Sequence, residues 1–182
     1  MNTSSSLFIG TDHRGFELKN QLVEWLKAEG LEVTDCGAFT LDPNDDYPDF
    51  ALAVAEKVAR YPDTRGIVLC DSGVGVTVIA NKVSGIQACL LTTPAEATKA
   101  RQDDNLNVLA LAAGTQTLDT AKAVITAFLE TPYVPEERFE RRLGKIRAYE
   151  KNAQPHTSNT SSRTVAIDHV LDQQLDQDVS NK

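Results

Sequence analysis

The 182-residue sequence predicts an α/β fold in which a largely parallel β-sheet carries helices on both faces. Short apolar runs rich in β-branched residues alternate with segments of helical periodicity, and this alternation is typical of βαβ crossovers. Hydrophobic residues make up 41% of the chain and charged residues 24%, as in a globular protein. The length is sufficient for one domain with a substantial core.

Five strands and six helices are expected from the alternation. The strands are Leu7–Ile9, Leu31–Cys36, Gly66–Cys70, Ile86–Leu91 and Asn107–Leu111. The helices are Phe16–Ala28, Asp49–Arg60, Val76–Val83, Pro94–Arg101, Leu118–Glu130 and Pro135–Asn152. The first helix illustrates the pattern, because its apolar residues recur on one face and Gly30 follows its last turn.

The composition changes near residue 153. Residues 1–152 are expected to form the folded domain, and residues 153–182 a polar linker and tail. The stretch "PHTSNTSSR" has few apolar residues and is typical of a flexible linker. The last residues carry one weak helical stripe, so the tail is expected either to form a short helix or to be disordered.

Charge and cysteine content limit the classes of partner. The formal net charge of −8 argues against nucleic acid or an anionic membrane, because both would be repelled. No apolar run approaches the ~20 residues that span a bilayer, and the first residues lack a signal-peptide pattern. Three cysteines at no metal-like spacing favour a reducing compartment, the cytoplasm.

Ligands of parallel α/β sheets bind outside the carboxyl ends of the strands, where the strand order reverses. The candidate sites are therefore three segments: "GTDHRG" after the first strand, "CDSGVG" after the third and "RQDDNLN" before the fifth.

Cys70 ends the third strand and faces the start of the next helix. Unpaired N–H groups there favour a thiolate, which can act as a base or nucleophile. The alternative is a small buried hydrophobic residue, the usual state of a free cysteine. Cys36 and Cys89 precede no glycine loop and are expected in the core.

The residues after Cys70, Ser72-Gly73-Val74-Gly75, would let backbone N–H groups converge on an anion. The segment matches neither the dinucleotide fingerprint nor the phosphate-binding P-loop. A tight turn without a ligand explains "SGVG" equally well.

Two further groups of charged residues suit a phosphate or sugar hydroxyls. Asp12, His13 and Arg14 follow the first strand, where helix capping by Asp12 is the structural alternative. Arg138 and Arg142 are four residues apart, so they share a helix face and can grip one phosphate. A solvated charged surface is the alternative explanation for the two arginines.

Together these motifs resemble the ribose-5-phosphate isomerase B family, which includes the galactose-6-phosphate isomerase subunits. The resemblance covers about residues 8–146 and rests on ordered motifs: "IGTDHRGFELK", "DYPDFA", "GIVLCDSGVGVTVIANKVSGI", "NLNVLAL" and "ERFERRLGKI". It implies a Rossmann-like or flavodoxin-like three-layer sandwich and a homodimer or homotetramer whose site is shared between subunits. It also implies no metal or organic cofactor.

The reaction implied by the resemblance is aldose–ketose isomerisation of a sugar phosphate through a cis-enediolate, which needs a base and oxyanion donors. The family's base is a cysteine at position 70 or a glutamate at position 76, where this chain has Val76, so Cys70 is the expected base. The resemblance further implies that the amides of residues 71–75 hold the enediolate oxygen and that Ser72 assists ring opening. The implied substrate-binding residues are Asp12, His13, Tyr47, Asp71, Ser72, Gly73, Val74, Gly75, Asp104, Arg138 and Arg142.

The chain departs from the family pattern in three places, which involve four residues. The family's ring-opening histidine and the asparagine after it are replaced by Asp103 and Asp104, so Asp103 is the candidate acid. A glycine that follows the cysteine is replaced by Asp71, and a phosphate-binding arginine by Gly114. One cation fewer and added carboxylates are expected to weaken phosphate binding, unless Arg14 compensates.

The leading functional prediction is isomerisation of ribose 5-phosphate to ribulose 5-phosphate. A hexose 6-phosphate, such as that of allose or galactose, is the alternative substrate. A non-catalytic sugar-phosphate-binding protein or an inactive subunit of a hetero-oligomer is the alternative function, favoured by Asp103. A flavin-binding protein would need phosphate-loop Ser or Thr residues that "TDHRG" does not offer.

Overall fold

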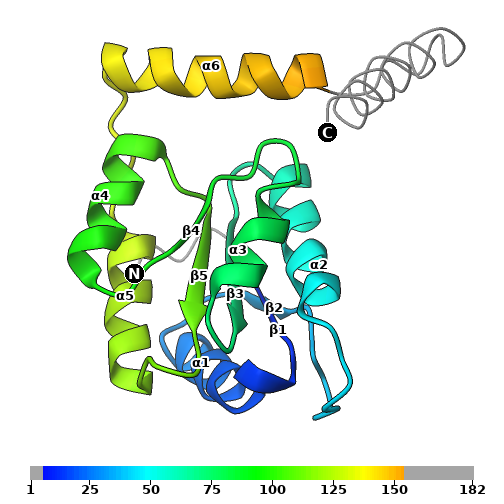
Figure 1. Ribbon diagram of the computed structural model, residues 1–182. Coiled ribbons are helices and arrows are strands. Elements are labelled where there is room, and N and C mark those ends of the chain that lie inside the picture. Colours follow the sequence, from blue (N-terminus) through cyan, green and yellow to red (C-terminus); the bar gives the residue numbers. More distant parts are fainter. Residues whose placement is uncertain (1–5, 154–182) are drawn as a thin grey trace, which may run out of the picture. The chain divides into compact units, whose positions relative to one another are not determined.

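The computed structural model describes residues 6–153 (Figure 1). The strands in this range are β1 (Leu7–Thr11), β2 (Val33–Asp35), β3 (Arg65–Cys70), β4 (Ala88–Leu90) and β5 (Val108–Ala112). The α-helices are α1 (Phe16–Ala28), α2 (Tyr47–Arg60), α3 (Val74–Ala80), α4 (Pro94–Asp104), α5 (Leu118–Glu130) and α6 (Glu137–Ala153), and a 3-10 helix, η1, spans His13–Gly15.

The five strands form one parallel sheet in the order β2-β1-β3-β5-β4. Because all strands run the same way, Leu7 and Arg65 pair at the amino-terminal edge, while Cys70 and Ala112 pair at the carboxyl-terminal edge. The strand order reverses between β1 and β3. The predicted class is confirmed, with the last two strands interchanged relative to the flavodoxin-like order.

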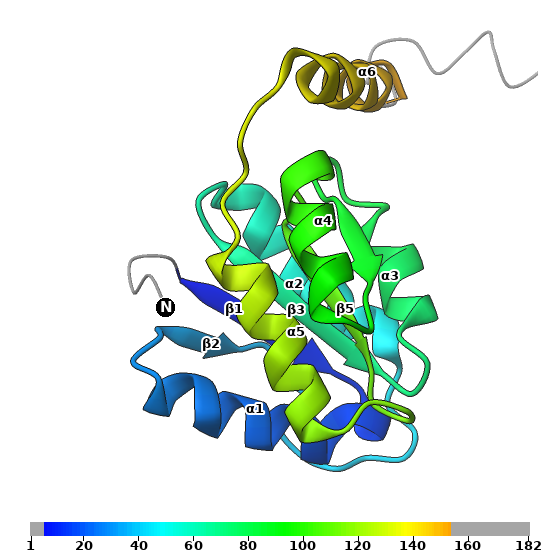
Figure 2. The same ribbon diagram turned by 90° about the vertical axis from the view of Figure 1, so that its left-hand side faces the viewer.

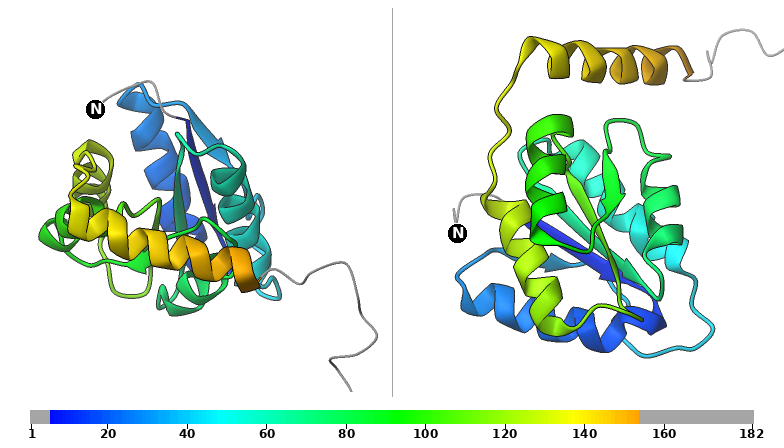
Figure 3. Two further views of the ribbon diagram at one scale, coloured as in Figure 1. Left: turned by 90° about the horizontal axis from the view of Figure 1, so that it is seen from above. Right: turned by 60° about the vertical axis from the view of Figure 1, so that its left-hand side comes forward.

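Helices cover both faces of the sheet (Figures 2 and 3). On one face, α1, α4 and α5 contribute to a core cluster that contains Leu22, Ala97 and Phe128. On the other face, α2 and α3 enclose a second cluster around Val54 and Val76. The central strands β1, β3 and β5 are buried almost throughout, which explains why they read as continuous apolar runs in the sequence.

Several element boundaries differ from the predicted ones. The helix α3 begins at Val74 rather than Val76, because Gly73 (φ 72°) turns the chain directly into it. The helix α4 continues to Asp104 rather than stopping at Arg101, and Asn105 (φ 49°) ends it in the left-handed conformation. The edge strands β2 and β4 are three residues each, shorter than expected, since each pairs on one side only.

The prediction that Cys36 and Cys89 lie in the core is wrong in degree. Both are half-buried and pack against the margins of the two core clusters, because they lie at the edge strands. Burial raises the pKa of both thiols.

The chain divides into two compact units, residues 1–147 and 148–182. Of the second unit, the structure describes only the end of α6. The predicted linker and tail therefore lie outside the described residues, apart from Ala153, which is the last residue of α6. Within residues 6–153, no helix has the length and apolar content to cross a membrane.

Candidate active site

The reversal of strand order brings together two of the three loops singled out from the sequence. The loop after β1 contains Asp12 and η1, and the loop after β3 contains Asp71–Gly73. The two neighbouring strands are linked at this edge by Thr11, whose Oγ1 donates a hydrogen bond to the Leu69 carbonyl oxygen at 3.0 Å. The site expected at a topological switch point is thus centred on the ends of β1 and β3.

Cys70 is the last residue of β3 and is 5% exposed. The Gly73 backbone N–H donates a hydrogen bond to its sulfur at 3.2 Å. Such a bond stabilises negative charge on sulfur, which suits a thiolate that accepts a proton. The thiol is therefore both a buried apolar side chain of the second core cluster and a polar group of the loop.

The glycines of "SGVG" have different geometric roles. Gly73 has a left-handed backbone, and a Cβ there would lie 2.5 Å from Leu90 Cδ1. A Cβ on Gly75 would lie 2.6 Å from Tyr47 Cζ and 3.0 Å from its hydroxyl oxygen. The absence of a side chain at Gly75 therefore lets the Tyr47 ring, from the start of α2, lie against the loop that follows Cys70.

Ser72 Oγ accepts a hydrogen bond from the Val74 N–H at 3.3 Å.

Asp12 has the capping role that was the alternative to ligand binding. Its Oδ1 accepts a hydrogen bond from the Arg14 N–H at 3.1 Å at the start of η1. The side chain is also buried, and this burial raises the pKa of the Asp12 carboxyl group. A buried carboxyl group at the carboxyl-terminal edge remains suited to binding a sugar hydroxyl, so capping and ligand binding are compatible.

His13 is held by a residue that the sequence analysis missed. Asp45 Oδ1 accepts a hydrogen bond from the His13 N–H at 2.9 Å and lies 2.7 Å from the ring Nδ1. The Asp45 side chain is 11% exposed, and its Oδ2 is buried without a hydrogen-bond partner in the described part of the chain. This contact fixes the imidazole and leaves Nε2 for a ligand. The only sequence signal for Asp45 is its position two residues before Tyr47.

Asp71 explains two departures from the family pattern at once. A Cβ on Gly114 would lie 2.6 Å from Asp71 Oδ1, so a side chain at 114 and the observed position of Asp71 exclude one another. The Asp71 carboxylate in turn lies 3.3 Å from Nη2 of Arg14. Both side chains are more than half exposed, so this ion pair contributes little to stability but directs the Arg14 guanidinium toward the Cys70 loop.

Asp103 and Asp104 lie at the other edge of the sheet from Cys70, in a helix rather than in the loop that was expected before the fifth strand. They form the last turn of α4, which runs antiparallel to the strands and leads into the amino-terminal end of β5. A segment that precedes a parallel strand must lie at the amino-terminal edge. Asp103 also pairs with Lys99 Nζ at 2.7 Å.

Arg138 and Arg142 are reached from the same amino-terminal edge of the sheet. The helix α5 ends at this edge, and six residues separate it from α6, which carries both arginines. The start of α6 is held by Tyr133, whose hydroxyl donates a hydrogen bond to Glu140 Oε1 at 2.7 Å. Arg138 pairs with Glu136 at 2.9 Å and stacks over the Phe139 ring. Both arginines are exposed, so the solvated surface described above is their state in the single chain.

The predicted site residues thus divide into two groups at opposite edges of the sheet. One group surrounds Cys70. The other group lies at the end of α4 and on α6, the helix that comes after α5. A strand of five residues spans about 17 Å. A pentose phosphate is too short to bridge this distance and so to contact both groups of one chain at once. One chain does not bring all predicted residues onto one ligand. Among the described residues there is no cluster of His, Cys, Asp and Glu that would hold a metal ion.

Comparison with known proteins identifies a class to which this geometry belongs. Residues 7–146 match the family model described as Ribose/Galactose Isomerase. The chain therefore belongs to the ribose/galactose isomerase family.

Individual relatives agree with this assignment. Ribose-5-phosphate isomerase B of Mycolicibacterium paratuberculosis is 38% identical over 148 residues, which cover 81% of this chain and 93% of that protein. The Escherichia coli protein of the same name is 37% identical over 142 residues, covering 78% and 94%. The structure of ribose-5-phosphate isomerase B from Mycoplasma genitalium with bound ribulose 5-phosphate aligns with a TM-score of 0.79 and 42% identity, over 82% of this chain and 99% of that one.

Proposed function

We propose that this protein is an aldose–ketose isomerase that interconverts ribose 5-phosphate and ribulose 5-phosphate. The observation that carries the proposal is the Cys70 thiol, which accepts a hydrogen bond from Gly73 at the carboxyl-terminal edge of β3, in a chain 42% identical to a ribulose-5-phosphate-bound isomerase B. Such a thiol can move a proton between adjacent carbons of an open-chain sugar.

The proposed reaction begins with the open-chain aldose. The Cys70 thiolate takes the proton from C2, and the electrons of that C–H bond form a C1=C2 double bond while the aldehyde oxygen O1 becomes negative. The O2 hydroxyl then passes its proton to O1. The thiol finally returns its proton to C1, which leaves the carbonyl at C2. Amides of residues 71–75 are the proposed donors to the oxyanion.

The remaining residues near Cys70 are proposed to bind and orient the sugar. Asp12 and the His13 ring, which Asp45 holds at 2.7 Å, supply an acceptor and a donor or acceptor for hydroxyl groups. Tyr47 closes the other side, since its ring lies against Gly75. Ser72 is the proposed aid to ring opening.

We further propose that a second copy of the chain completes each site. Asp103, Asp104, Arg138 and Arg142 belong to the amino-terminal edge, so in a homodimer they would reach the Cys70 loop of the partner. This arrangement is supported by the separation of the two groups within one chain. The compartment proposed for the enzyme is the cytoplasm, in agreement with its free cysteines.

The direct test is to incubate the purified protein with ribose 5-phosphate, allose 6-phosphate and galactose 6-phosphate, and to follow ketose formation. The proposal requires that ribose 5-phosphate have the highest kcat/KM. Preference for a hexose phosphate would reassign the substrate. Binding of all three sugars without turnover would favour the non-catalytic alternative.

Arg142→Ala is expected to raise KM for the sugar phosphate and the inhibition constant for inorganic phosphate by about tenfold or more, because a charge-assisted bidentate contact is lost. Inhibition kinetics with inorganic phosphate measure this effect. The neighbouring Arg141→Ala changes the charge of α6 equally and serves as the control. Unchanged inhibition by phosphate in Arg142→Ala would return this residue to the solvated surface.

Asp103→His is expected to raise the rate on the cyclic sugar phosphate by about tenfold or more, because an imidazole can donate the proton that opens the ring. The Asp103 carboxylate lies 2.7 Å from the Lys99 ammonium group. Asp103→Asn is the control, since it also breaks the ion pair but adds no acid. A fall in rate for Asp103→His, with an unchanged fold, would instead make Asp103 a working catalytic residue.

A further inference from the structure

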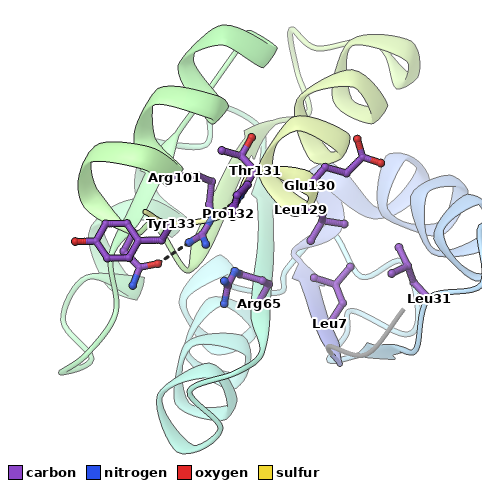
Figure 4. Close-up of a pocket in the computed structure, with 10 residues that line it drawn as sticks. Leu7, Leu31, Arg65, Arg101, Leu129, Glu130, Thr131, Pro132 and Tyr133 are labelled. Atoms are coloured by element: carbon purple, nitrogen blue, oxygen red, sulfur yellow. Dashed lines mark hydrogen bonds between the residues drawn. The ribbon is translucent and has the colours of Figure 1, made fainter. Parts of the chain in front are cut away.

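A cavity opens at the amino-terminal edge of the sheet, at the far ends of β1 and β3 from Cys70 (Figure 4). Its volume is about 530 Å³. Its polar side contains Arg65 from β3 and Arg101 from α4, and its apolar side contains Leu7, Leu31 and Leu129. None of these residues belongs to the proposed catalytic machinery.

Arg101 is a buried cation without an anionic partner among the described residues. Arg101 is only 2% exposed. It donates hydrogen bonds to three neutral oxygens: the Thr131 carbonyl at 3.3 Å, Asn105 Oδ1 at 2.9 Å and the Leu106 carbonyl. These bonds engage Nε and Nη1 of Arg101, and no anion among the described residues compensates its positive charge.

Arg65 adds a second positive charge to the same cavity, and the Asp63 carboxylate offsets part of it. Its guanidinium donates to the adjacent Thr64 carbonyl at 3.0 Å, a contact that leaves other N–H groups of the fork available. Figure 4 shows the Arg65 and Arg101 side chains approaching one another, while the Glu130 carboxylate at the rim points away from both. Burial, and then the charge of Arg65, lowers the pKa of Arg101 to about 10.

We propose that this cavity binds a phosphate monoester, with the phosphate between the guanidinium groups of Arg65 and Arg101 and the organic part against the leucines. Two planar guanidinium forks match the oxygens of a dianionic phosphate. The volume exceeds what a lone phosphate fills, and the apolar wall provides contact for a carbon-containing group. A bound dianion would compensate the charge of Arg101 and the part of the Arg65 charge that Asp63 does not offset.

The cavity is also connected by hydrogen bonds to segments that carry proposed active-site residues, and this part of the proposal rests on the proposed function. Through Arg101 the bound phosphate would be linked to Asn105 and Leu106, which directly follow Asp103 and Asp104. Through Thr131 it would be linked to the segment that leads to α6. Occupation of the cavity would therefore order both segments that carry groups for the partner's active site.

The test separates this cavity from the catalytic phosphate site by using Arg142→Ala as the background. Calorimetric titration with inorganic phosphate and with phenyl phosphate is expected to reveal binding in this background, with phenyl phosphate the tighter ligand. Adding Arg65→Gln should weaken that binding by about tenfold or more, because a charge-assisted contact is lost. Adding Arg60→Gln, an exposed arginine at the end of α2, removes the same charge and should leave it unchanged.

Three outcomes would overturn the proposal: no phosphate binding in the Arg142→Ala background, equal binding with and without Arg65→Gln, or phenyl phosphate binding no tighter than phosphate. Arg65→Lys, which keeps the charge without the fork, provides a second variant if the glutamine variant fails to fold. The readout is binding rather than turnover, so the result stands even if the protein proves inactive as an isomerase.

Discussion

Replacing Cys70 with alanine is expected to abolish isomerisation while leaving the fold intact. Loss of a general base typically lowers a rate by ~10²–10⁴. The substitution removes only a sulfur atom from the edge of the second core cluster, where the side chain is 5% exposed. Stopped-flow or coupled assays of ketose formation measure the rate, and a thermal melt measures the stability.

Two matched variants accompany Cys70→Ala. Cys36→Ala and Cys89→Ala remove half-buried thiols that lie away from the glycine loop, and both should retain activity. Inorganic phosphate should still compete with the sugar phosphate for binding to the Cys70→Ala protein, because the arginines of this variant are intact. Near-full activity of Cys70→Ala would show that the base lies elsewhere, with Asp71 and Asp103 the next candidates.

Mixing Cys70→Ala with Arg142→Ala, assayed at a substrate concentration far below the raised KM of the second variant, is expected to give more activity than either variant alone. If each site takes Cys70 from one chain and Arg142 from its partner, a mixed dimer has one site with both lesions and one site with neither. After random exchange of subunits, about a quarter of all sites should be intact. The rate of the mixture relative to wild type measures this fraction.

The control for the mixing experiment carries both substitutions in one chain. Combined with either single variant, that doubly substituted chain cannot supply the missing residue, so the activity should not rise above that of the single variant. A site built within one chain would behave differently, because neither lesion could then be rescued by a partner. Native mass spectrometry monitors the exchange of subunits. If mixed dimers form and the activity does not recover, the shared site is excluded.

The parts of the fold that the sequence predicted are those set by local chemistry. Alternating apolar periods predicted the order of strands and helices, and Gly30 (φ 83°) marks the end of α1 as expected. Boundaries failed where tertiary contacts decide them. The edge strands are short because each has one neighbour, and α4 extends through Asp103 and Asp104 until Asn105 reverses the chain.

The candidate site was predictable only in part. The loops after β1 and β3 are adjacent, as the rule for parallel sheets predicts, because both follow the carboxyl ends of neighbouring strands. The segment before β5 failed the same rule, since it enters its strand from the other edge. Asp45 was missed because its contact with His13 joins residues far apart in sequence. The coupling of Asp71 with Gly114 is likewise a matter of three-dimensional packing.

The three-residue edge strands have a consequence for assembly. A second copy that joined by β-augmentation could add only a few backbone hydrogen bonds at β2 or β4, and short edges of this kind discourage open-ended polymerisation. The proposed dimer would therefore rely on side chains of helices and loops. Contacts of this kind are specific in register, so in the proposed dimer they would select a closed pair over a growing ribbon.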